Sequence, residues 1–567
     1  MGLKEKFLAP SPKKMADKTL LPEETISLVE GRLKQAGTEI FKELRRVDKG
    51  RLGIPVYMSL YGTEGLSLTK RLKQMGKGST EALAQASALM ELVERYSLFK
   101  WVKKGDFRRG YLDGKETISV NKLLDSVEDP ERDEEARRVA ADFLSKIPFH
   151  LAKALALPQK REISIPFYWF WLLYEFNGSA AGNTYAEAAV QGLCELIERH
   201  ASALSTWLPG PFEEVVLDEL SAEVASLKEA FDRLGIKLFI RNFTFGLPVP
   251  TIGVLAYDPS TFPHRSEIVY TAGTATHPER ALVRALTEVA QLAGDFDTDG
   301  KYLESGLPKF SNLEEAEIII QAQGQVKLSE LPNLWRADHA EELVLLTEAL
   351  SQQGLESFFL DLAIPELNLP VVYVVVPGMH FRERLFLSPL YQLVRTLALY
   401  HPLEEALSLL EEIDQKIDRY YVSAYLGQLW MRKGLYEEAC KAFEKALALA
   451  PPPEDEPAIY CQWAYAELQR GRYKSAEEVA LKGVSRASLP ELFNILGTAY
   501  FKQKRLPEAL EAYMQAVELN PEGAVDYANV GACLVALGLK KEAERFFESA
   551  HLLDPTLDLE PYRKATL

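Results

Sequence analysis

Pairs of oxygen-bearing side chains recur at one spacing in three stretches of the sequence. The pairs are Glu91 with Glu94, Glu195 with Glu198, and Glu288 with Gln291. Residues three positions apart lie on one face of a helix, so the side-chain oxygen atoms of each pair lie side by side. Two carboxylates that are buried together repel each other and need a cation, and Mg²⁺ prefers oxygen ligands. Arg95 and Arg199, which follow two of the pairs, carry forked donors that suit phosphate.

The three stretches are copies of one another. Residues 78–95 align without a gap to residues 182–199 at a constant offset of 104, with matches at Gly, Thr, Ala, Glu, Leu and Arg. A third relative begins at Gly273 and keeps the acid of its pair at Glu288. One Glu-x-x-Glu-Arg triple alone is typical of a solvated helix face. Its recurrence within helices rich in Ala and Leu favours a shared site instead.

The elements that position these pairs are predicted from the first 385 residues. Short apolar runs such as IPVYMSLYG, KLFIRNFTF, VPTIGVLAYD and LPVVYVVVPG are rich in Val, Ile, Tyr and Phe, which predicts strands. Amphipathic helical stretches lie between these runs. We therefore expect residues 1–385 to form an α/β or α+β domain that carries the three acid-pair helices.

The end of the chain repeats in a different way. From about Tyr420 one pattern recurs, which consists of an apolar residue followed by Gly, then an Ala, an aromatic residue four positions later and a Pro. Two of its glycines, Gly497 and Gly531, are 34 residues apart. This period resembles tetratricopeptide repeats, of which about four copies are present. We expect connecting helices over 386–419 and an all-α superhelical domain over 420–567. Two roles stay open for it: a structural or dimerising appendage, or a docking surface for a protein partner.

Composition excludes several classes of protein. The chain has 567 residues and a net charge of −17, and 47% of its residues are hydrophobic. The acidic balance disfavours a general nucleic-acid binder, which needs a basic face. The most apolar run, residues 165–173, is too short to span a bilayer. The four cysteines are too far apart in sequence to predict a metal site or disulfides. We therefore expect a cytoplasmic protein without nucleic-acid or membrane partners.

The order of the motifs resembles the YcaO family, which couples ATP use to activation of peptide-backbone amides. The resembling segments are Lys18 to Thr25, Gly76-Lys77-Gly78-x-Thr80 with Ser87-x3-Glu91-x2-Glu94-Arg95, Ala-Gly-Asn183-Thr-x2-Glu187 with Glu195-x2-Glu198-Arg199, Ala-Leu-x-Glu288-x2-Gln291, and Asp361 before Leu369-Pro-Val-Val-Tyr-Val-Val-Val-Pro-Gly378. The resemblance covers residues 18–378. It implies a YcaO-type nucleotide-binding domain that uses ATP and Mg²⁺ and acts on a peptide or protein substrate.

The resemblance also implies roles for individual residues. The magnesium ligands or their immediate supports would be Glu91, Glu94, Glu195 and Glu198. Contacts to the nucleotide or its phosphates would come from Lys18, Thr25, Ser87, Asn183, Arg199 and Asp295. Glu187 and Gln291 would complete the metal shell and also lie against the nucleotide. Together with Arg199, these two are the residues that we expect to take part in catalysis.

Two departures from the family pattern bear on the reaction. The family commonly shows Leu-Thr-Arg after the aspartate that corresponds to Asp361, whereas this chain has Leu-Ala-Ile there. Members that form azoline rings tend to end in a proline-rich tail, whereas this chain ends Pro-Tyr-Arg-Lys-Ala-Thr-Leu after its repeats. The second departure disfavours azoline formation. The arrangement with C-terminal repeats resembles a subgroup that is linked in bacteria to sulfur-type modification of a ribosomal protein.

We therefore expect an ATP- and magnesium-dependent enzyme that phosphorylates a backbone amide oxygen of a peptide or protein, such as a ribosomal protein. The phosphorylated amide would then undergo nucleophilic, sulfur-related modification. The resemblance favours a homodimer, and the repeats favour a protein partner. Two alternatives stay open. One is an assembly protein that binds Mg-ATP and recruits partners through its repeats, and the other is an azoline-forming cyclodehydratase that needs a separate partner protein.

Overall fold

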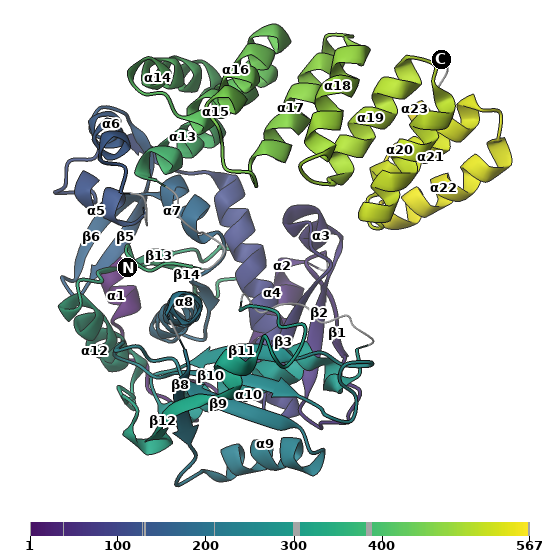
Figure 1. Cartoon of the computed structure of the whole chain (residues 1–567). Helices are drawn as coiled ribbons and strands as arrows, with labels where there is room; N and C mark the ends of the chain where they lie inside the picture. Colours follow the sequence, from purple (N-terminus) through teal and green to yellow (C-terminus); the bar gives the residue numbers. More distant parts are fainter. Residues whose placement is uncertain are drawn as a thin grey trace. The chain divides into compact units, whose positions relative to one another are not determined.

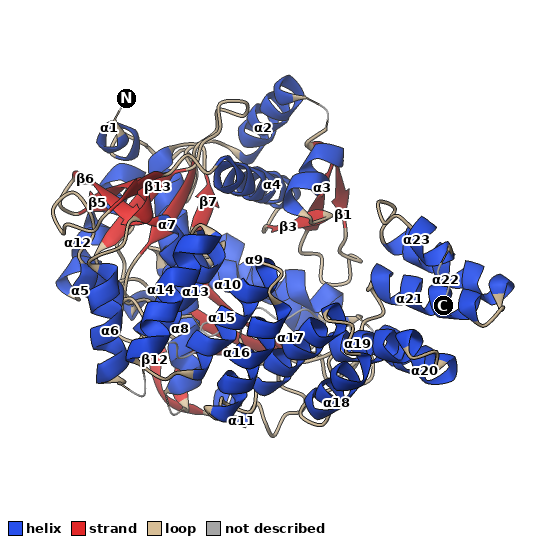
Figure 2. Ribbon diagram, turned by 90° about the horizontal axis from the view of Figure 1, so that it is seen from above, coloured by secondary structure: helices blue, strands red, loops and turns tan. Residues whose placement is uncertain are grey.

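The computed structural model describes residues 2–37, 39–127, 129, 132–208, 210–298, 307–381 and 388–564. The chain divides into two units, Met1–Asp133 with Ala141–Pro389 and Glu134–Ala140 with Leu390–Leu567 (Figure 1). The first unit combines strands and helices, and the second is helical throughout its described residues (Figure 2). The predicted fold class, a mixed α/β domain followed by all-α repeats, is therefore confirmed. The domain boundaries at 385 and 419 stay predictions.

Three sheets form the framework of the first unit. Their strand orders are β1-β2-β3, β11-β10-β9-β8-β12, and β4-β5-β13-β14-β7 with β6 paired to β5. Paired strands run antiparallel, except that β8 and β12 are parallel. The strands are β1 (Phe41–Arg46), β2 (Val56–Tyr61), β3 (Lys73–Lys77), β4 (Arg108–Gly110), β5 (Phe149–Leu157), β6 (Arg161–Pro166), β7 (Ser179–Ala181), β8 (Phe212–Val216), β9 (Lys237–Asn242), β10 (Thr251–Tyr257), β11 (Val269–Thr274), β12 (Ala322–Lys327), β13 (Ser357–Asp361) and β14 (Val371–Val375).

The helices of the first unit are distributed among these strands along the chain. They are α1 (Leu3–Phe7), α2 (Pro22–Ala36), α3 (Thr63–Thr69), α4 (Glu81–Lys104), α5 (Val120–Asp125), α7 (Phe167–Tyr174), α8 (Tyr185–Trp207), α9 (Ala222–Arg233), α10 (Pro278–Ala293), α11 (Glu317–Ile320) and α12 (His339–Gln352), with 3₁₀ turns η1 (Gly294–Phe296) and η2 (Leu328–Glu330). The first residues of helix α6 (Glu134–Leu144) belong to the second unit. Among the described helices, none combines the length and the apolar character needed to cross a membrane.

Each acid-pair stretch folds as a short strand followed by a long helix. The three copies are β3 with α4, β7 with α8, and β11 with α10. Thr80 and Thr184 cap the first two helices, because each side chain accepts a hydrogen bond from a backbone N–H of the first turn. In the third copy the imidazole of His277 takes this place. All three helices therefore begin at a polar cap that the sequence repeats.

Small residues allow strand and helix to lie in direct contact within a copy. A Cβ atom on Gly76 of β3 would lie 2.1 Å from the nitrogen of Ala88 in α4. A Cβ atom on Gly273 of β11 would lie 2.4 Å from the nitrogen of Ala285 in α10. Each alanine follows its glycine by the same number of residues, so the two copies pack alike. Only a residue without a side chain fits at these two strand positions.

The three copies also interlock. Helix α4 packs against β7, α8 packs against β11, and α10 packs against β3, so every helix touches the strand of another copy. In the second copy the small residue lies on the helix, where a Cβ atom on Gly192 of α8 would lie 2.8 Å from the carbonyl oxygen of Gly178. This ring of contacts brings together helices that are about a hundred residues apart in the sequence.

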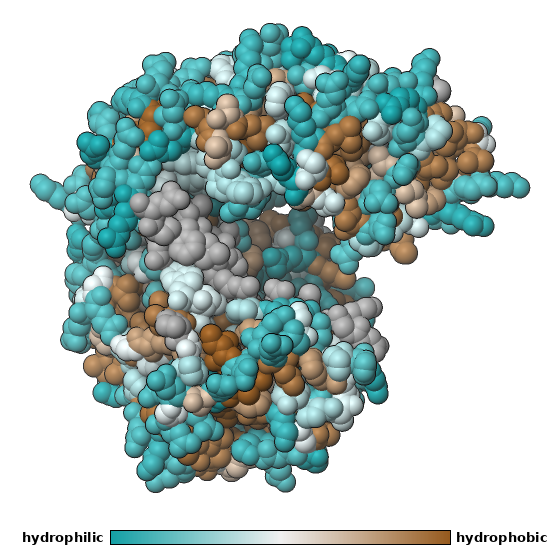
Figure 3. All heavy atoms as spheres, viewed as in Figure 1, coloured by the Kyte–Doolittle hydropathy of each residue, from teal (hydrophilic) through white to brown (hydrophobic). Residues whose placement is uncertain are grey.

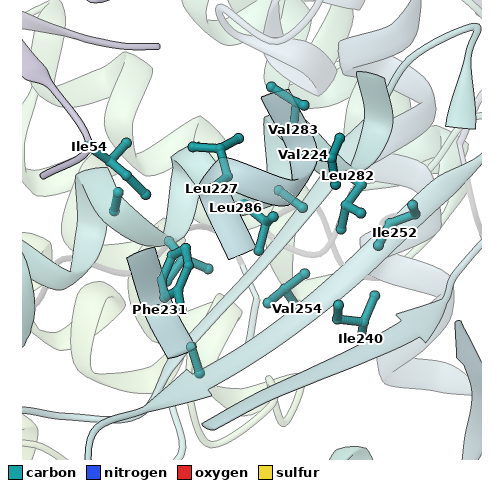
Figure 4. Packing of buried hydrophobic residues seen from close by; sticks show 14 of the residues in the cluster. Ile54, Val224, Leu227, Phe231, Ile240, Ile252, Val254, Leu282, Val283 and Leu286 are labelled. Carbon is teal, nitrogen blue, oxygen red and sulfur yellow. The ribbon is translucent and has the colours of Figure 1, made fainter. Parts of the chain in front are cut away.

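An apolar core fixes α10 on the five-stranded sheet (Figure 4). Phe231 of α9 and Leu286 of α10 pack in one cluster with Ile240 of β9 and Val254 of β10. All four side chains are at most 7% exposed. Because α10 is held by this core, the polar residues on its other face have a fixed position.

The second unit is built from helix pairs. Its helices are α13 (Pro389–Tyr400), α14 (Leu403–Lys416), α15 (Tyr420–Arg432), α16 (Tyr436–Ala448), α17 (Glu456–Gln469), α18 (Tyr473–Val484), α19 (Pro490–Lys502), α20 (Leu506–Leu519), α21 (Ala524–Ala536), α22 (Lys540–Leu553) and α23 (Glu560–Arg563). In three pairs a glycine lies directly against a ring of the next helix: Gly427 against Phe443, Gly497 against Tyr513, and Gly531 against Phe547. The repeated sequence period therefore corresponds to a repeated helix crossing. Apolar atoms gather over the later helices of this unit in Figure 3, and Met514, Leu519 and Val525 are exposed.

Replacing Gly273 with alanine tests the close packing of β11 on α10. The added methyl group would lie 2.4 Å from both the carbonyl oxygen of Ala281 and the nitrogen of Ala285, so the helix must move. We expect Gly273→Ala to lower the free energy of unfolding by about 1–3 kcal/mol, measured by urea denaturation.

Gly31→Ala is the matched control, because Gly31 lies within α2 and a Cβ atom there meets nothing within 4 Å. We expect this variant to be roughly 0.5–1 kcal/mol more stable than the wild type. Equal stability of the two variants would contradict the proposed close contact.

Candidate functional site

Arg95 joins the acid pair of α4 to the next copy. Its Nε and Nη2 atoms donate to Glu91 Oε1 at 3.1 and 2.9 Å, and its Nη1 atom lies 3.2 Å from Glu94 Oε1. The same Nη1 atom donates to Ser179 Oγ of β7 at 3.0 Å. Ser179 Oγ in turn donates to Glu94 Oε1 at 2.5 Å. The sequence offered Arg95 as a donor to phosphate, but these contacts instead use its guanidinium group to hold the acid pair in place.

Burial and mutual repulsion favour the protonated forms of two predicted magnesium ligands. Burial is the largest cause that raises the pKa of Glu94 well above its ordinary value, and the charges of Glu91 and Glu195 add to it. Burial also raises the pKa of Glu195 to about 7, against the opposing charges of Arg199 and Arg95. Glu94 lies on α4 and Glu195 on α8, so the two acid pairs are close enough to repel each other.

Lys77 lies where acids of all three helices converge. Its ammonium group forms an ion pair with Glu288 of α10. Burial is the main cause that lowers the pKa of Lys77 to about 8, and Arg284 acts in the same direction. The charges of Glu198 on α8 and Glu91 on α4 oppose this shift. A single lysine at the end of β3 therefore interacts with acids from α4, α8 and α10.

One acid of each helix contacts the strand of another copy. The three contacts are Glu94 with Ser179 of β7, Glu198 with the backbone N–H of Thr274 in β11 at 3.0 Å, and Glu288 with Lys77 of β3. We call Glu91, Glu94, Glu195, Glu198 and Glu288 the acid centre. The interlocked fold thus brings acids of all three helices to Lys77 and to neighbouring strands, and their assignment to one metal site stays a prediction.

Four predicted nucleotide contacts form a second cluster at the N-terminus of α8. Asn183 Nδ2 donates to Glu187 Oε1 at 3.2 Å, and Thr25 Oγ1 donates to Asn183 Oδ1 at 3.2 Å. Lys18 Nζ lies 3.8 Å from Glu187 Oε1, and the backbone N–H of Thr19 donates to Glu187 Oε2 at 3.1 Å. The structure therefore brings Lys18, Thr25, Asn183 and Glu187 together from distant parts of the chain.

A polar pocket lies beside the second cluster. Its lining includes Lys18 and Glu187 of the second cluster, together with Arg284 of α10. Arg284 Nη1 donates to Gln191 Oε1 of α8 at 2.6 Å, and the charge of Arg284 also acts on Lys77 beside the acid centre. The pocket therefore lies next to the acid centre, and Arg284 interacts with both.

Arg199 and Ser87 lie near the acid centre. The charge of Arg199 acts on both Glu195 and Lys77, which places its guanidinium group within reach of the acids. Ser87 is half-buried on α4, one helical turn before Glu91. Their assignment to the nucleotide stays a prediction.

Gln291 and Asp295 follow the acid of the third helix at increasing distance. Gln291 is half-buried on α10, one turn after Glu288. Asp295 lies beyond the end of α10 in η1, where it is 2% exposed and its Oδ1 atom accepts a hydrogen bond from the backbone N–H of Leu52 at 3.2 Å. The structure thus gives Asp295 a backbone partner outside the acid centre, and its predicted contact to the nucleotide stays a prediction.

Sequence reasoning did not assign roles to Lys77 and Arg284. The repeat alignment could have identified Arg284. It occupies in the third copy the position that Ser87 and Gln191 occupy in the first two, four residues before the first acid of the pair. Lys77 stands in the Gly-Lys-Gly turn before the first helix. Its importance depends on the packing of β3 against α10, which the repeat pattern does not reveal.

The acid centre is not a closed metal cage. Within the part of the chain that the structure describes, no three Asp, Glu, His or Cys side chains are grouped as ligands for one ion. Mg²⁺ usually keeps several waters and is bound by one or two carboxylates together with phosphate oxygens. Buried acids with raised pKa values gain from a nearby divalent cation, because the cation offsets their repulsion. The residues present therefore fit Mg²⁺ that binds together with a polyphosphate.

Residues 75–380 match the sequence model of the family described as YcaO cyclodehydratase, ATP- and Mg²⁺-binding, which is more than half of the chain. The chain belongs to the YcaO family. Members of this family are ATP-dependent enzymes, and their domain binds ATP and Mg²⁺. Residues 421–453 and 490–522 match tetratricopeptide-repeat models. The predicted family, repeats and cofactors are therefore confirmed.

Individual relatives differ in how much of the chain they share. An uncharacterized protein of Methanothermobacter thermautotrophicus is 27% identical over 380 residues, 64% of this chain and 95% of its own length. The Escherichia coli ribosomal protein S12 methylthiotransferase accessory factor YcaO is 35% identical over 136 residues, 22% of this chain and 21% of that protein. A solved heterocyclase in complex with substrate and cofactor has a TM-score of 0.52 at 23% identity, covering 66% of this chain and 55% of its own. The last likeness concerns the fold alone.

The raised pKa of Glu195 makes the stability of this YcaO protein depend on pH. Between the ordinary value of 4.5 and about 7, the folded protein holds a proton on Glu195 that the unfolded chain releases. Stability in metal-free buffer therefore falls as pH rises through this window. Glu195→Gln removes the titrating group. As the pH rises from 4.5 to 8, we therefore expect the free energy of unfolding of the wild type to fall by about 1–3 kcal/mol relative to that of the variant. Urea denaturation with a chelator present measures this difference.

Glu348→Gln on the exposed face of α12 is the control, since it neutralises a carboxylate outside the acid centre. If Glu195→Gln and Glu348→Gln show the same pH dependence, Glu195 does not hold a proton in the folded protein.

Proposed function

We propose that this chain uses ATP and Mg²⁺ to phosphorylate a backbone amide oxygen of a peptide or protein, which activates the amide carbon for attack by a nucleophile. The observation that carries the proposal is the convergence of five acids from α4, α8 and α10 beside Lys77 and the polar pocket. Solvated helix faces give no reason for such convergence. The ATP- and Mg²⁺-binding character of the family supports it.

The site residues address the main electrostatic difficulty of this reaction, the approach of an electron-rich amide oxygen to a polyanion. Magnesium, when bound, would screen the phosphate charge and orient the transferred group. Lys77, Arg199 and Arg284 supply positive charge beside the acids. Arg95 is a positioning residue, because its hydrogen bonds to Glu91 and Ser179 fix the acid pair. Preorganised charge of this kind stabilises a transition state without reorganisation.

The cluster around Glu187 suits polar contacts to the nucleotide. Asn183 and Thr25 form a hydrogen-bonded chain to the Glu187 carboxylate. This chain holds the carboxylate in one orientation at the N-terminal turn of α8. We propose that Lys18, Thr25, Asn183 and Glu187 bind the nucleotide, and that Glu187, Arg199 and Gln291 act at the reacting groups.

We propose a sulfur-related modification of a protein, such as a ribosomal protein, as the overall outcome. The E. coli relative whose name refers to ribosomal protein S12 supports this choice, although the match covers 22% of this chain. Tetratricopeptide repeats typically mediate contacts between proteins, which supports a protein partner or substrate. Azoline formation with a separate partner protein is the alternative outcome of the same amide activation. The homodimer and the cytoplasmic location stay predictions.

A second candidate function is an assembly protein that binds Mg-ATP without turnover and recruits partners through its repeats. The exposed apolar side chains Met514, Leu519 and Val525 of the repeat unit favour a recruiting role. Release of phosphate from ATP separates the two candidates. An enzyme releases phosphate faster when its substrate is added, whereas an assembly protein binds ATP and releases none.

The proposed site predicts magnesium-dependent ATP binding that needs acids from two helices. Calorimetric titration of the wild type with ATP should show binding with Mg²⁺ and much weaker binding with a chelator. We expect Glu94→Gln combined with Glu198→Gln to weaken binding more than tenfold, because neither side chain can then ionise beside a bound cation. Circular dichroism checks that the double variant is folded.

Glu348→Gln combined with Glu478→Gln is the matched control, since both glutamates lie outside the acid centre. Unchanged binding by the double variant of the acid centre would place the nucleotide elsewhere.

A further inference from the structure

The turn between α3 and β3 carries three cationic side chains that no acid neutralises. Lys70, Arg71 and Lys73 are all exposed, and none of them forms an ion pair in the part of the chain that the structure describes. The whole chain has a net charge of −17, so this turn differs in sign from the protein around it. Unpaired positive charge at one place on an acidic protein attracts an acidic ligand.

Hydrogen bonds hold the backbone of this turn in place. The N–H of Lys70 donates to the carbonyl of Leu66 at 2.9 Å, and the N–H of Arg71 donates to Thr69 Oγ1 at 3.2 Å. The carbonyl of Leu72 accepts a hydrogen bond from the end of β2 at 3.1 Å. Lys70 has a φ of 55°, a conformation that residues with a Cβ atom rarely adopt. The three cations are therefore presented by an ordered turn.

Apolar side chains and a groove lie next to these cations. Leu72 is 63% exposed, and Leu66 of α3 is 42% exposed. A groove of about 400 Å³ between α3 and α4 is lined by Glu64, Ser67, Leu68, Lys100, Lys103 and Lys104. We call the turn 70–73, Leu66 and this groove the basic-apolar surface.

Most charges of the groove itself are already paired. Lys100 lies 3.5 Å from Glu64 and 3.2 Å from Glu366, and Lys104 lies 3.5 Å from Asp106. Lys103 is exposed and has no acid partner among the described residues. The unpaired charge of the basic-apolar surface therefore comes mainly from the turn, and the groove adds one further cation.

Arg71 connects this surface to the acid centre through one aromatic ring. Its guanidinium carbon lies 4.8 Å from the centre of the Phe176 ring, and that of Arg95 lies 4.7 Å from the same point. The carbonyl of Phe176 also accepts a hydrogen bond from Arg95 Nη1 at 3.2 Å. Arg95 holds Glu91. A ligand on Arg71 therefore lies beside the residues that position the acid pair of α4.

The chemistry of the surface favours a peptide as its ligand. Guanidinium and ammonium groups pair with carboxylates, and exposed apolar side chains next to them mark a site for apolar side chains of a partner. A nucleic acid would offer phosphates to the cations, but it would leave Leu66 and Leu72 without comparable apolar contacts. An acidic peptide that also carries apolar side chains satisfies both features.

We propose that the basic-apolar surface binds an acidic peptide segment with apolar side chains, and that this segment belongs to the protein substrate. The second part rests on the proposed amide activation, because that reaction requires a peptide next to the acid centre. Carboxylates of the segment pair with Lys70, Arg71 and Lys73. Its apolar side chains pack on Leu66 and Leu72.

Fluorescence anisotropy with a fluorescein-labelled short peptide that alternates Glu and Leu tests this proposal on the full chain without ATP. We expect the wild type to bind the peptide, and Arg71→Gln combined with Lys73→Gln to bind it about fivefold more weakly. Binding by the wild type should weaken as salt is added, because exposed charges are screened. Circular dichroism checks the fold. Absence of binding by the wild type, or equal binding by the folded double variant, would overturn the proposal.

Two further variants separate this surface from a general change in charge. Lys34→Gln combined with Lys237→Gln removes the same charge from exposed positions of α2 and β9 and should leave the affinity at the wild-type value. Leu72→Ser keeps every charge and should weaken binding through the lost apolar contact. An equal loss in the Lys34 and Lys237 variant would show a long-range effect and reject the surface, and unchanged binding by Leu72→Ser would reject its apolar part.

Other ligands for the same surface give different results. A labelled single-stranded oligonucleotide that binds more tightly than the peptide, and loses affinity in the Arg71 and Lys73 variant, would assign the surface to nucleic acid. A wild-type dimer that becomes a monomer in this variant, measured by sedimentation, would assign it to a second copy of the chain. Either result overturns the peptide proposal.

The peptide measurement can fail independently of the proposed function. If the wild type binds the peptide but not Mg-ATP, the surface stands as a peptide site and its role toward a substrate fails with the proposed function. If the wild type binds Mg-ATP but not the peptide, the surface fails and the proposed function stands.

Discussion

The burial of several carboxylates beside one another is the constraint on which the site of the first unit depends. Glu94 and Glu195 lie on different helices, yet the charge of the other acid pair contributes to the raised pKa of each. Such an arrangement is unfavourable in the free protein unless protons, cations or a metal ion offset the charge. Arg95 and Lys77 supply part of this compensation. Burial still raises the pKa of Glu94 and Glu195, and a divalent cation bound with a polyphosphate would offset this cost.

The interlocked copies explain how the fold can hold such a centre. Each helix lies between its own strand and the strand of another copy, and the glycines at the crossings set the separation. The apolar core beneath α10 then resists any relaxation that would move Glu288 away from Lys77. The acids are therefore kept together by packing elsewhere in the unit, as is common for functional sites that are locally unfavourable.

The sequence predicts the parts of this account that repeat. The offset between the first two acid-pair stretches identifies the helices, and the period of the C-terminal region identifies the helical repeats. It does not predict which strand each helix meets, because this depends on packing between copies. For that reason the hydrogen bonds of Arg95 to Glu91 were not predicted, and Lys77 was given no role although it pairs with Glu288.

The most direct test of the central claim is to locate a metal ion in crystals of the full chain grown with Mn²⁺ and a non-hydrolysable ATP analogue. Anomalous scattering identifies manganese without reference to the shape of the density. The account predicts manganese between the acid pairs of α4 and α8, beside Glu288, with the phosphates toward Arg284 and Lys18. Manganese bound away from these acids, or a nucleotide bound outside the polar pocket, would contradict it.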